Sequence, residues 1–255
     1  MGIVFDEKLD LFHLETEHTS YVIGLADKRT YVGHVYYGKR IRLQDMRYLL
    51  RIGEPPYVPS ENNRERCSFY DTFPFEYSGN GVGDYRESAI AVTTVEGQHA
   101  ILPTYVSYGI TKEKPLLAGL PSSFDRDKNA ETLIIHCTDS VLNVNVDLYY
   151  TVFEDTDMIT RSVHICNQDE KPIYLTKALS ACLDMDDNDY EMLTLHGSWA
   201  RERQMDRRAI GYGKTSVGSI KGESSHQEHP FMAWSYDSFL SALLYDMILT
   251  IFLID

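Results

Sequence analysis

The stretch LNVNVDLYYTV, residues 142–152, carries the clearest structural pattern in the sequence. Every second residue from Leu142 to Val152 is apolar, and most of the residues between them are polar, namely Asn143, Asn145, Asp147 and Thr151. Strict alternation of this kind is typical of an antiparallel strand with one buried face and one solvent-exposed face. The stretch therefore predicts a half-buried strand in an antiparallel sheet.

Further strands are predicted on both sides of this stretch. Towards the C-terminus, Met158–Cys166 and Ile173–Leu183 are separated by the polar segment 167–172, which favours a hairpin between them. Tyr190–His196 is expected to pair with the strand that precedes it across residues 186–189. Towards the N-terminus the strand candidates are Tyr21–Leu25, Tyr31–Tyr37, Ala89–Val95 and Ala100–Tyr108.

Two segments have the composition of long loops. Residues 38–66 contain GEPPYVPSENN at positions 53–63, and a polar, Pro-rich loop of this length is usually functional or disordered. Residues 67–88 are dense in Phe, Tyr and Gly. No helical pattern longer than about ten residues precedes the last segment, and there is no internal repeat or domain linker. Many short strands joined by turns predict an all-β fold, a large sandwich.

Composition restricts the function. The net charge of −14 disfavours nucleic acids and anionic membranes as partners, because both require basic patches, and it is compatible with a neutral sugar. The four cysteines are far apart, with no Cys-x-x-Cys pair. The N-terminus has acidic residues within its first ten positions and does not resemble a secretory signal. These features predict a cytoplasmic protein with free thiols.

The segment HGSWARERQ, residues 196–204, places an aromatic ring beside two guanidinium groups and a carboxylate. An aromatic ring can stack on the C–H face of a sugar, while Arg and Glu side chains bind its hydroxyls. The same composition also fits a surface loop with ion pairs. A second segment, SSHQEHPF at residues 224–231, follows it.

Together, these two segments resemble the N-terminal domain of alpha-galactosidases of glycoside hydrolase family 36. Upstream segments agree and occur in the family's order: HVYYGK (34–39), EYS (76–78), GDYR (83–86), GLP (119–121), ITRS (159–162) and KALS (177–180). The resemblance covers roughly residues 10–235. It implies a β-supersandwich of two large antiparallel sheets packed face to face, a galactose-mutarotase-like fold, over residues 1–237.

The resemblance also implies an activity for the parent enzyme, the hydrolysis of terminal alpha-galactosides such as melibiose and raffinose with retention of configuration. The family carries both catalytic aspartates in a TIM barrel that follows this domain, and 255 residues leave no room for one. We therefore expect no catalytic residue, no cofactor and no metal. The expected role is a domain that shapes the active site and the homo-oligomer.

The last segment, Ser238–Asp255, is apolar and departs from the family pattern. It is too short, and carries Asp246 too centrally, to predict a membrane span. We expect an aberrant tail that ends a truncated or frame-shifted product and packs poorly.

Five residues are predicted to contact substrate, from loops at one end of the sandwich: Arg66, Asp84, Arg86, Trp199 and Arg201. In the family an arginine near the end of the long loop reaches the active site of a neighbouring subunit, and Arg66 matches it. The family's acidic partner falls at Gly53, beside Glu54. Asp84 and Arg86 can bind a sugar hydroxyl or brace their loop as a bidentate pair.

Other site chemistries are less well supported. GNGVG at residues 79–83 lacks the strand and helix that a phosphate-binding loop requires. The acidic run 184–189 lacks the glycine and glutamate of a calcium loop, which favours a hairpin turn, and His226 with His229 has no evident third metal ligand.

Two rival functions remain. One is a stand-alone carbohydrate-binding or oligomerisation module. The other is a mutarotase-like sugar epimerase, which would need a histidine acid and a glutamate base, such as His164 and Glu191.

Overall fold

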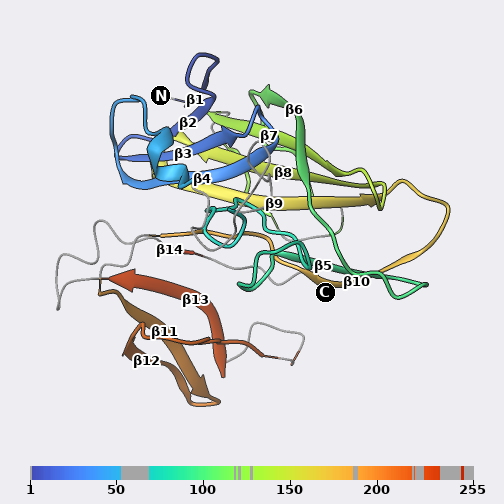
Figure 1. The fold of residues 1–255 in the computed structure, drawn as a ribbon. Helices are drawn as coiled ribbons and strands as arrows, with labels where there is room; N and C mark the ends of the chain where they lie inside the picture. The colour runs from blue at the N-terminus through green and yellow to red at the C-terminus, as the bar shows by residue number, and fades with distance from the viewer. Residues whose placement is uncertain are drawn as a thin grey trace. The chain divides into compact units, whose positions relative to one another are not determined.

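The computed structural model describes residues 2–52, 69–117, 119, 122–126, 129–185, 189–219, 221, 227–235 and 248–249. The chain divides into two compact units, Met1–Met185 and Asp186–Asp255 (Figure 1). The described residues include two short 3₁₀ helices, η1 (Arg47–Leu50) and η2 (Glu154–Thr156), and no α-helix.

The first unit contains two four-stranded antiparallel meanders and one two-stranded sheet. The first meander consists of β1 (Gly2–Asp6), β2 (Leu11–Glu15), β3 (Thr19–Ala26) and β4 (Tyr31–Lys39). The second consists of β6 (Thr104–Thr111), β7 (Ala130–Asp139), β8 (Val144–Phe153) and β9 (Met158–Asn167). The small sheet pairs β5 (Ile90–Thr94) with β10 (Ile173–Ala178).

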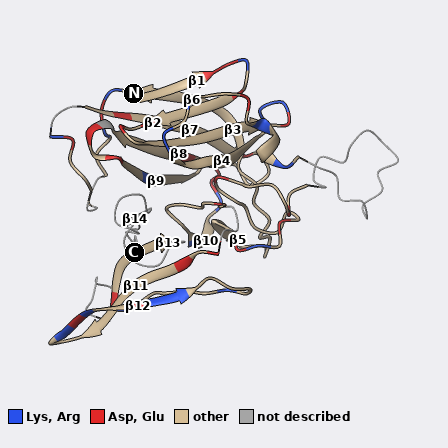
Figure 2. Cartoon of the chain, turned by 90° about the vertical axis from the view of Figure 1, so that its left-hand side faces the viewer, with Lys and Arg blue, Asp and Glu red and all other residues tan. Residues whose placement is uncertain are grey.

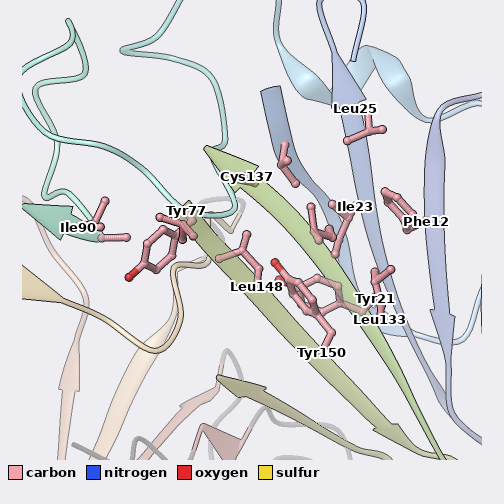
Figure 3. Close-up of a cluster of buried hydrophobic side chains, with 14 of the residues drawn as sticks. Phe12, Tyr21, Ile23, Leu25, Tyr77, Ile90, Leu133, Cys137, Leu148 and Tyr150 are labelled. Carbon is pink, nitrogen blue, oxygen red and sulfur yellow. The ribbon is translucent and has the colours of Figure 1, made fainter. Parts of the chain in front are cut away.

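The two meanders share the main hydrophobic core, part of which is drawn in Figure 3. On β8, Val144, Val146, Leu148, Tyr150 and Val152 are each at most 1% exposed, so the predicted alternation is confirmed. Thr151 on the opposite face is buried as well, and a hydrogen bond with the Thr132 hydroxyl satisfies its own hydroxyl there. A fully buried side chain of this kind contributes about 1.5–3 kcal/mol, so β8 is central to the stability of the unit.

The strand β3 is buried on both of its faces. Tyr21, Ile23 and Leu25 belong to the main core, whereas Val22 packs in a second cluster on the other side of the sheet. That second cluster is completed by Leu50 of η1, by the N-cap residue of η1 and by the aromatic loop 69–75: Met46, Phe69, Tyr70, Phe73 and Phe75. The second core therefore fixes η1 and the aromatic loop against the first meander, and both segments lead to the candidate site.

The second unit is a single antiparallel sheet in the order β12-β11-β13-β14. Its strands are β11 (Glu191–Ser198), β12 (Arg201–Ala209), β13 (Glu228–Ser235) and the two-residue β14 (Ile248–Leu249). Apart from β14, which pairs with β13, the expected aberrant tail 238–255 lies outside the described residues. Its packing stays a prediction.

The all-β prediction is confirmed, and the strands of the structure overlap every predicted strand. Within the first unit, two antiparallel meanders lie face to face across one core, as the sandwich prediction requires. The aromatic segment 69–88 is a loop, as its composition predicts. It forms two isolated β-bridges, one between Phe75 and Gly33 and one between Asn80 and Ile101.

Three details of the strand predictions are wrong. The strand after residue 172 ends at Ala178 and pairs with β5, so it forms no hairpin with β9. The strand β11 pairs with β12 and β13 and not with the strand before it. The strand predicted from Ala100 begins at Thr104. Pairing with the adjacent strand is only a tendency, and the connection between Ala178 and Glu191 is too long to impose a tight hairpin.

Candidate functional site

Asp84 and Arg86 form a bidentate ion pair with each other. The sequence left this arrangement open as the alternative to binding a sugar hydroxyl. Arg86 Nε donates to Asp84 Oδ1 and Nη2 donates to Oδ2, both at 2.9 Å. Nη2 also donates to the carbonyl of Phe73 at 2.6 Å. The Asp84 side chain is only 3% exposed, whereas that of Arg86 is 40% exposed. The pair therefore braces its loop against the aromatic segment, and sugar contact by these two residues stays a prediction.

Asp184 extends this pair into a larger polar cluster. Its Oδ2 accepts hydrogen bonds from Arg86 Nη1 and from Arg51 Nη2, each at 3.0 Å. Arg51 caps the C-terminal end of η1 with a φ of 52°, in the left-handed region that side chains rarely adopt. Three segments far apart in the sequence therefore meet at one carboxylate. No local sequence pattern indicates Arg51 or Asp184, because their contact depends on the tertiary fold.

Trp199 and Arg201 lie together at the tip of the β11–β12 hairpin in the second unit. Ser198 pairs with Arg201, so Trp199 and Ala200 form the turn, and Ala200 has a φ of 63°. Trp199 is 84% exposed. Arg201 is the first residue of β12, so it belongs to a strand and not to a loop as predicted. Figure 2 shows the arginines of β12 in blue.

The remaining predicted residue, Arg66, lies outside the described residues, as do Gly53 and Glu54. His226 and residues 186–188 of the acidic run also lie outside them. The structure thus brings Asp84 together with Arg86, and Trp199 together with Arg201. The grouping of all five residues at one end of the sandwich stays a prediction.

A buried polar network surrounds Glu76, and sequence reasoning did not find it. The Glu76 carboxylate is fully buried and accepts hydrogen bonds from the hydroxyls of Tyr21, at 2.8 and 3.0 Å, and of Tyr150, at 2.7 Å. Arg161 Nη2 lies 3.1 Å from Glu76 Oε2, and His34 Nδ1 lies 2.9 Å from Oε1. The one feature of the sequence that could have indicated this network is the position of Glu76 between two aromatic residues, Phe75 and Tyr77.

The charges of this network are fixed by their mutual contacts. Burial alone would raise the pKa of Glu76, but Arg161 and the hydrogen bond with His34 hold the pKa below its usual value. Burial raises the pKa of Tyr21 and of Tyr150, so both hydroxyls keep their protons and donate. Arg161 Nη1 also donates to the Cys182 carbonyl at 2.8 Å, which anchors the segment that carries Asp184.

The described residues contain no cluster of three or more His, Cys, Asp or Glu side chains arranged to hold a metal ion. The two residues considered for epimerase chemistry both lie beside an oppositely ionisable side chain. His164 Nδ1 lies 3.5 Å from Asp147 Oδ2, and Arg207 Nη2 lies 3.0 Å from Glu191 Oε2. None of the helices in the described part of the chain has the length and apolar character needed to cross a bilayer.

Comparison with known proteins decides the family. The model of the glycosyl hydrolase family 36 N-terminal domain matches residues 30–240. The chain belongs to this family. It is 37% identical to alpha-galactosidase Mel36A of Lactobacillus acidophilus over 235 residues, which cover 91% of this chain and 32% of Mel36A.

Solved structures of family 36 enzymes have the same fold as this domain. The alpha-galactosidase AgaB of Geobacillus stearothermophilus matches 93% of this chain with a TM-score of 0.84 and 33% identity. A variant of AgaA from the same organism, in complex with raffinose, matches 88% of this chain with a TM-score of 0.81 and 34% identity. The chain spans about a third of the length of these relatives, 32% of AgaB and 31% of AgaA.

Proposed function

We propose that this chain serves as the non-catalytic N-terminal domain of an alpha-galactosidase that hydrolyses terminal alpha-galactosides of the melibiose and raffinose type. The observation that carries the proposal is the match of residues 30–240 to the family 36 N-terminal domain, together with the raffinose complex of AgaA. A neutral oligosaccharide substrate also fits a chain with a net charge of −14.

The chemistry of the described residues supports binding and positioning. A retaining glycosidase needs a free carboxylate nucleophile about 5 Å from a carboxylic acid. Asp84 is not free in this sense, because its two oxygens accept from Arg86 and its side chain is buried. Trp199 and Arg201, in contrast, place a ring and a guanidinium at the tip of the β11–β12 hairpin, a composition that suits sugar stacking and hydrogen bonding.

The proposal includes a homo-oligomer in which this domain, through Arg66, contacts substrate bound to a neighbouring subunit. It also places the protein in the cytoplasm. The described cysteines Cys137, Cys166 and Cys182 are free thiols, which supports a reducing compartment.

A chimera tests the proposal. Residues 2–235 of this chain would replace the matching segment of AgaA, and raffinose hydrolysis would be compared with that of AgaA lacking the segment. We expect the chimera to be at least about 100-fold faster, because misplacing groups around a substrate by even 1 Å can cost this much. A chimera that folds and assembles like AgaA but hydrolyses raffinose no faster than the shortened enzyme would contradict the proposal.

A further inference from the structure

The strand β6 lies at one end of the second meander, so within the described residues only one of its two edges pairs with another strand, β7 (Figure 1). The outer edge is covered at its start, because the Tyr105 N–H donates to the carbonyl of Thr30 at 2.9 Å and a bulge shifts the register between Tyr105 and Ser107. Along residues 107–111, the structure describes no strand on the outer side. This edge therefore leaves backbone N–H and C=O groups available to another strand.

Charged side chains usually protect such an edge from pairing with another chain. The other three edge strands of the two meanders each carry one, namely Asp6 on β1, Lys39 on β4 and Arg161 on β9. The sequence of β6, TYVSYGIT, contains none. Two chains of net charge −14 repel each other, so an uncharged edge is where a second copy can approach at the least electrostatic cost.

The same edge carries apolar side chains that the fold leaves partly open. Tyr108 and Ile110 are each 37% exposed, and they share one face of β6 because they are two positions apart in a regular stretch of the ladder. The Tyr108 ring packs on Phe5 and Phe12, with centroids 4.9 and 5.0 Å away. Its position is thus fixed before a partner binds, which lowers the entropy lost on association.

The order of residues along this edge is self-complementary. When a second β6 pairs antiparallel with Gly109 opposite Gly109, Tyr108 of each copy faces Ile110 of the other, and Ser107 faces Thr111. Aromatic rings opposite β-branched side chains, and hydroxyls opposite hydroxyls, both stabilise antiparallel pairs. This register has a two-fold axis at Gly109, and two-fold contacts are the commonest between identical chains.

We propose that residues 107–111 form an interface between two copies of this chain, paired antiparallel about a two-fold axis at Gly109. The second meanders of the two copies then form one continuous sheet. The contact area is small, so we expect a dissociation constant of about 1–100 µM. The inference goes beyond the proposed function, in which the contact between subunits runs through Arg66.

The test is sedimentation equilibrium of the 255-residue chain and of two double variants designed for this register. Ser107→Lys with Thr111→Lys places lysine opposite lysine in a homodimer, and Ser107→Glu with Thr111→Glu places glutamate opposite glutamate. Both positions lie on the face opposite to Tyr108, so the substitutions do not disturb its packing on Phe5 and Phe12. Circular dichroism checks that both variants fold.

Each double variant should dimerise at least about tenfold more weakly than the unchanged chain, because like charges directly opposite each other destabilise a strand pair. An equal mixture of the two variants should form a heterodimer at least as tight as the unchanged homodimer, since every lysine then faces a glutamate. This recovery depends on the register, so association through a different surface would not produce it.

Val4→Lys with Val141→Lys is the matched control. It adds the same charge as the lysine variant, at positions that are 57% and 76% exposed and lie outside β6, and it should dimerise as the unchanged chain does. An unchanged chain that stays monomeric up to about 1 mM would overturn the interface. Double variants that associate like the control would also overturn it and would assign the association to another surface. Neither result bears on the proposed function, which the AgaA chimera tests separately.

Discussion

Replacing Arg161 with methionine is expected to lower the free energy of unfolding by about 3–5 kcal/mol. The substitution would leave the Glu76 carboxylate, which is fully buried, without its cation, and an unpaired buried charge has a cost of this size. It would also remove the guanidinium that lies 4.6 Å from the centre of the Tyr150 ring and the hydrogen bond to the Cys182 carbonyl. Urea unfolding followed by circular dichroism measures the change.

Two further variants control this experiment. The double variant Glu76→Gln, Arg161→Met removes both charges and should recover more than half of the loss, because the tyrosine hydroxyls keep an acceptor. Arg208→Met breaks an ion pair with Asp206 that is exposed on both sides, and it should change stability by less than about 1 kcal/mol. An Arg161→Met variant as stable as Arg208→Met would show that the buried network is energetically unimportant.

Replacing Gly79 with alanine is expected to destabilise the protein by about 3 kcal/mol or more. A Cβ at this position would lie 1.9 Å from the carbonyl oxygen of Ile101, which is backbone and cannot swing aside. The neighbouring Asn80 forms a bridge with Ile101, so relief of the clash would break that pairing. The glycine-rich segment 79–83 therefore serves a close backbone approach, which explains why it carries glycines without being a phosphate-binding loop.

Gly109→Ala is the matched control for this clash. Gly109 lies in the strand β6, does not adopt a positive φ, and has no heavy atom within 4 Å of the position that a Cβ would occupy. Its replacement should be neutral or stabilise the chain by about 0.4–1 kcal/mol, through the reduced entropy of the unfolded state. Melting curves of both variants measure the difference. Equal melting temperatures for the two would contradict the packing around Gly79.

The local pattern of the sequence was sufficient to predict most of the strands. On β8 the buried and exposed positions alternate as the residues Val144 to Tyr150 predict, because a strand's side chains point to opposite faces in turn. Strand partners could not be predicted in the same way. The pairing of β5 with β10 joins residues about 80 positions apart, such as Thr94 and Ile173, and no local signal encodes it.

The candidate site was predictable only where its residues are close in sequence. Asp84 and Arg86 are two positions apart, so the sequence could predict their bidentate pair as one of two alternatives, the other being contact with a sugar hydroxyl. Arg51 and Asp184 are 133 positions apart, and they meet only because the second core fixes η1 while Arg161 anchors the segment around Cys182. Glu76 belongs to the family segment EYS, but the sequence does not show that it is buried. Its burial depends on Tyr21 of β3 and Tyr150 of β8, which come from different meanders.

Hydrolysis of an aryl alpha-galactoside by the purified 255-residue chain tests most directly the claim that this domain binds and positions without cleaving. The chain would be produced in a host that lacks alpha-galactosidase and assayed beside an Asp84→Ala variant. We expect both proteins to show the rate of the buffer alone, because a glycosidic bond is cleaved only where a nucleophile and a proton donor are held in one site. Turnover that copurifies with the chain and falls in the Asp84→Ala variant would contradict this claim.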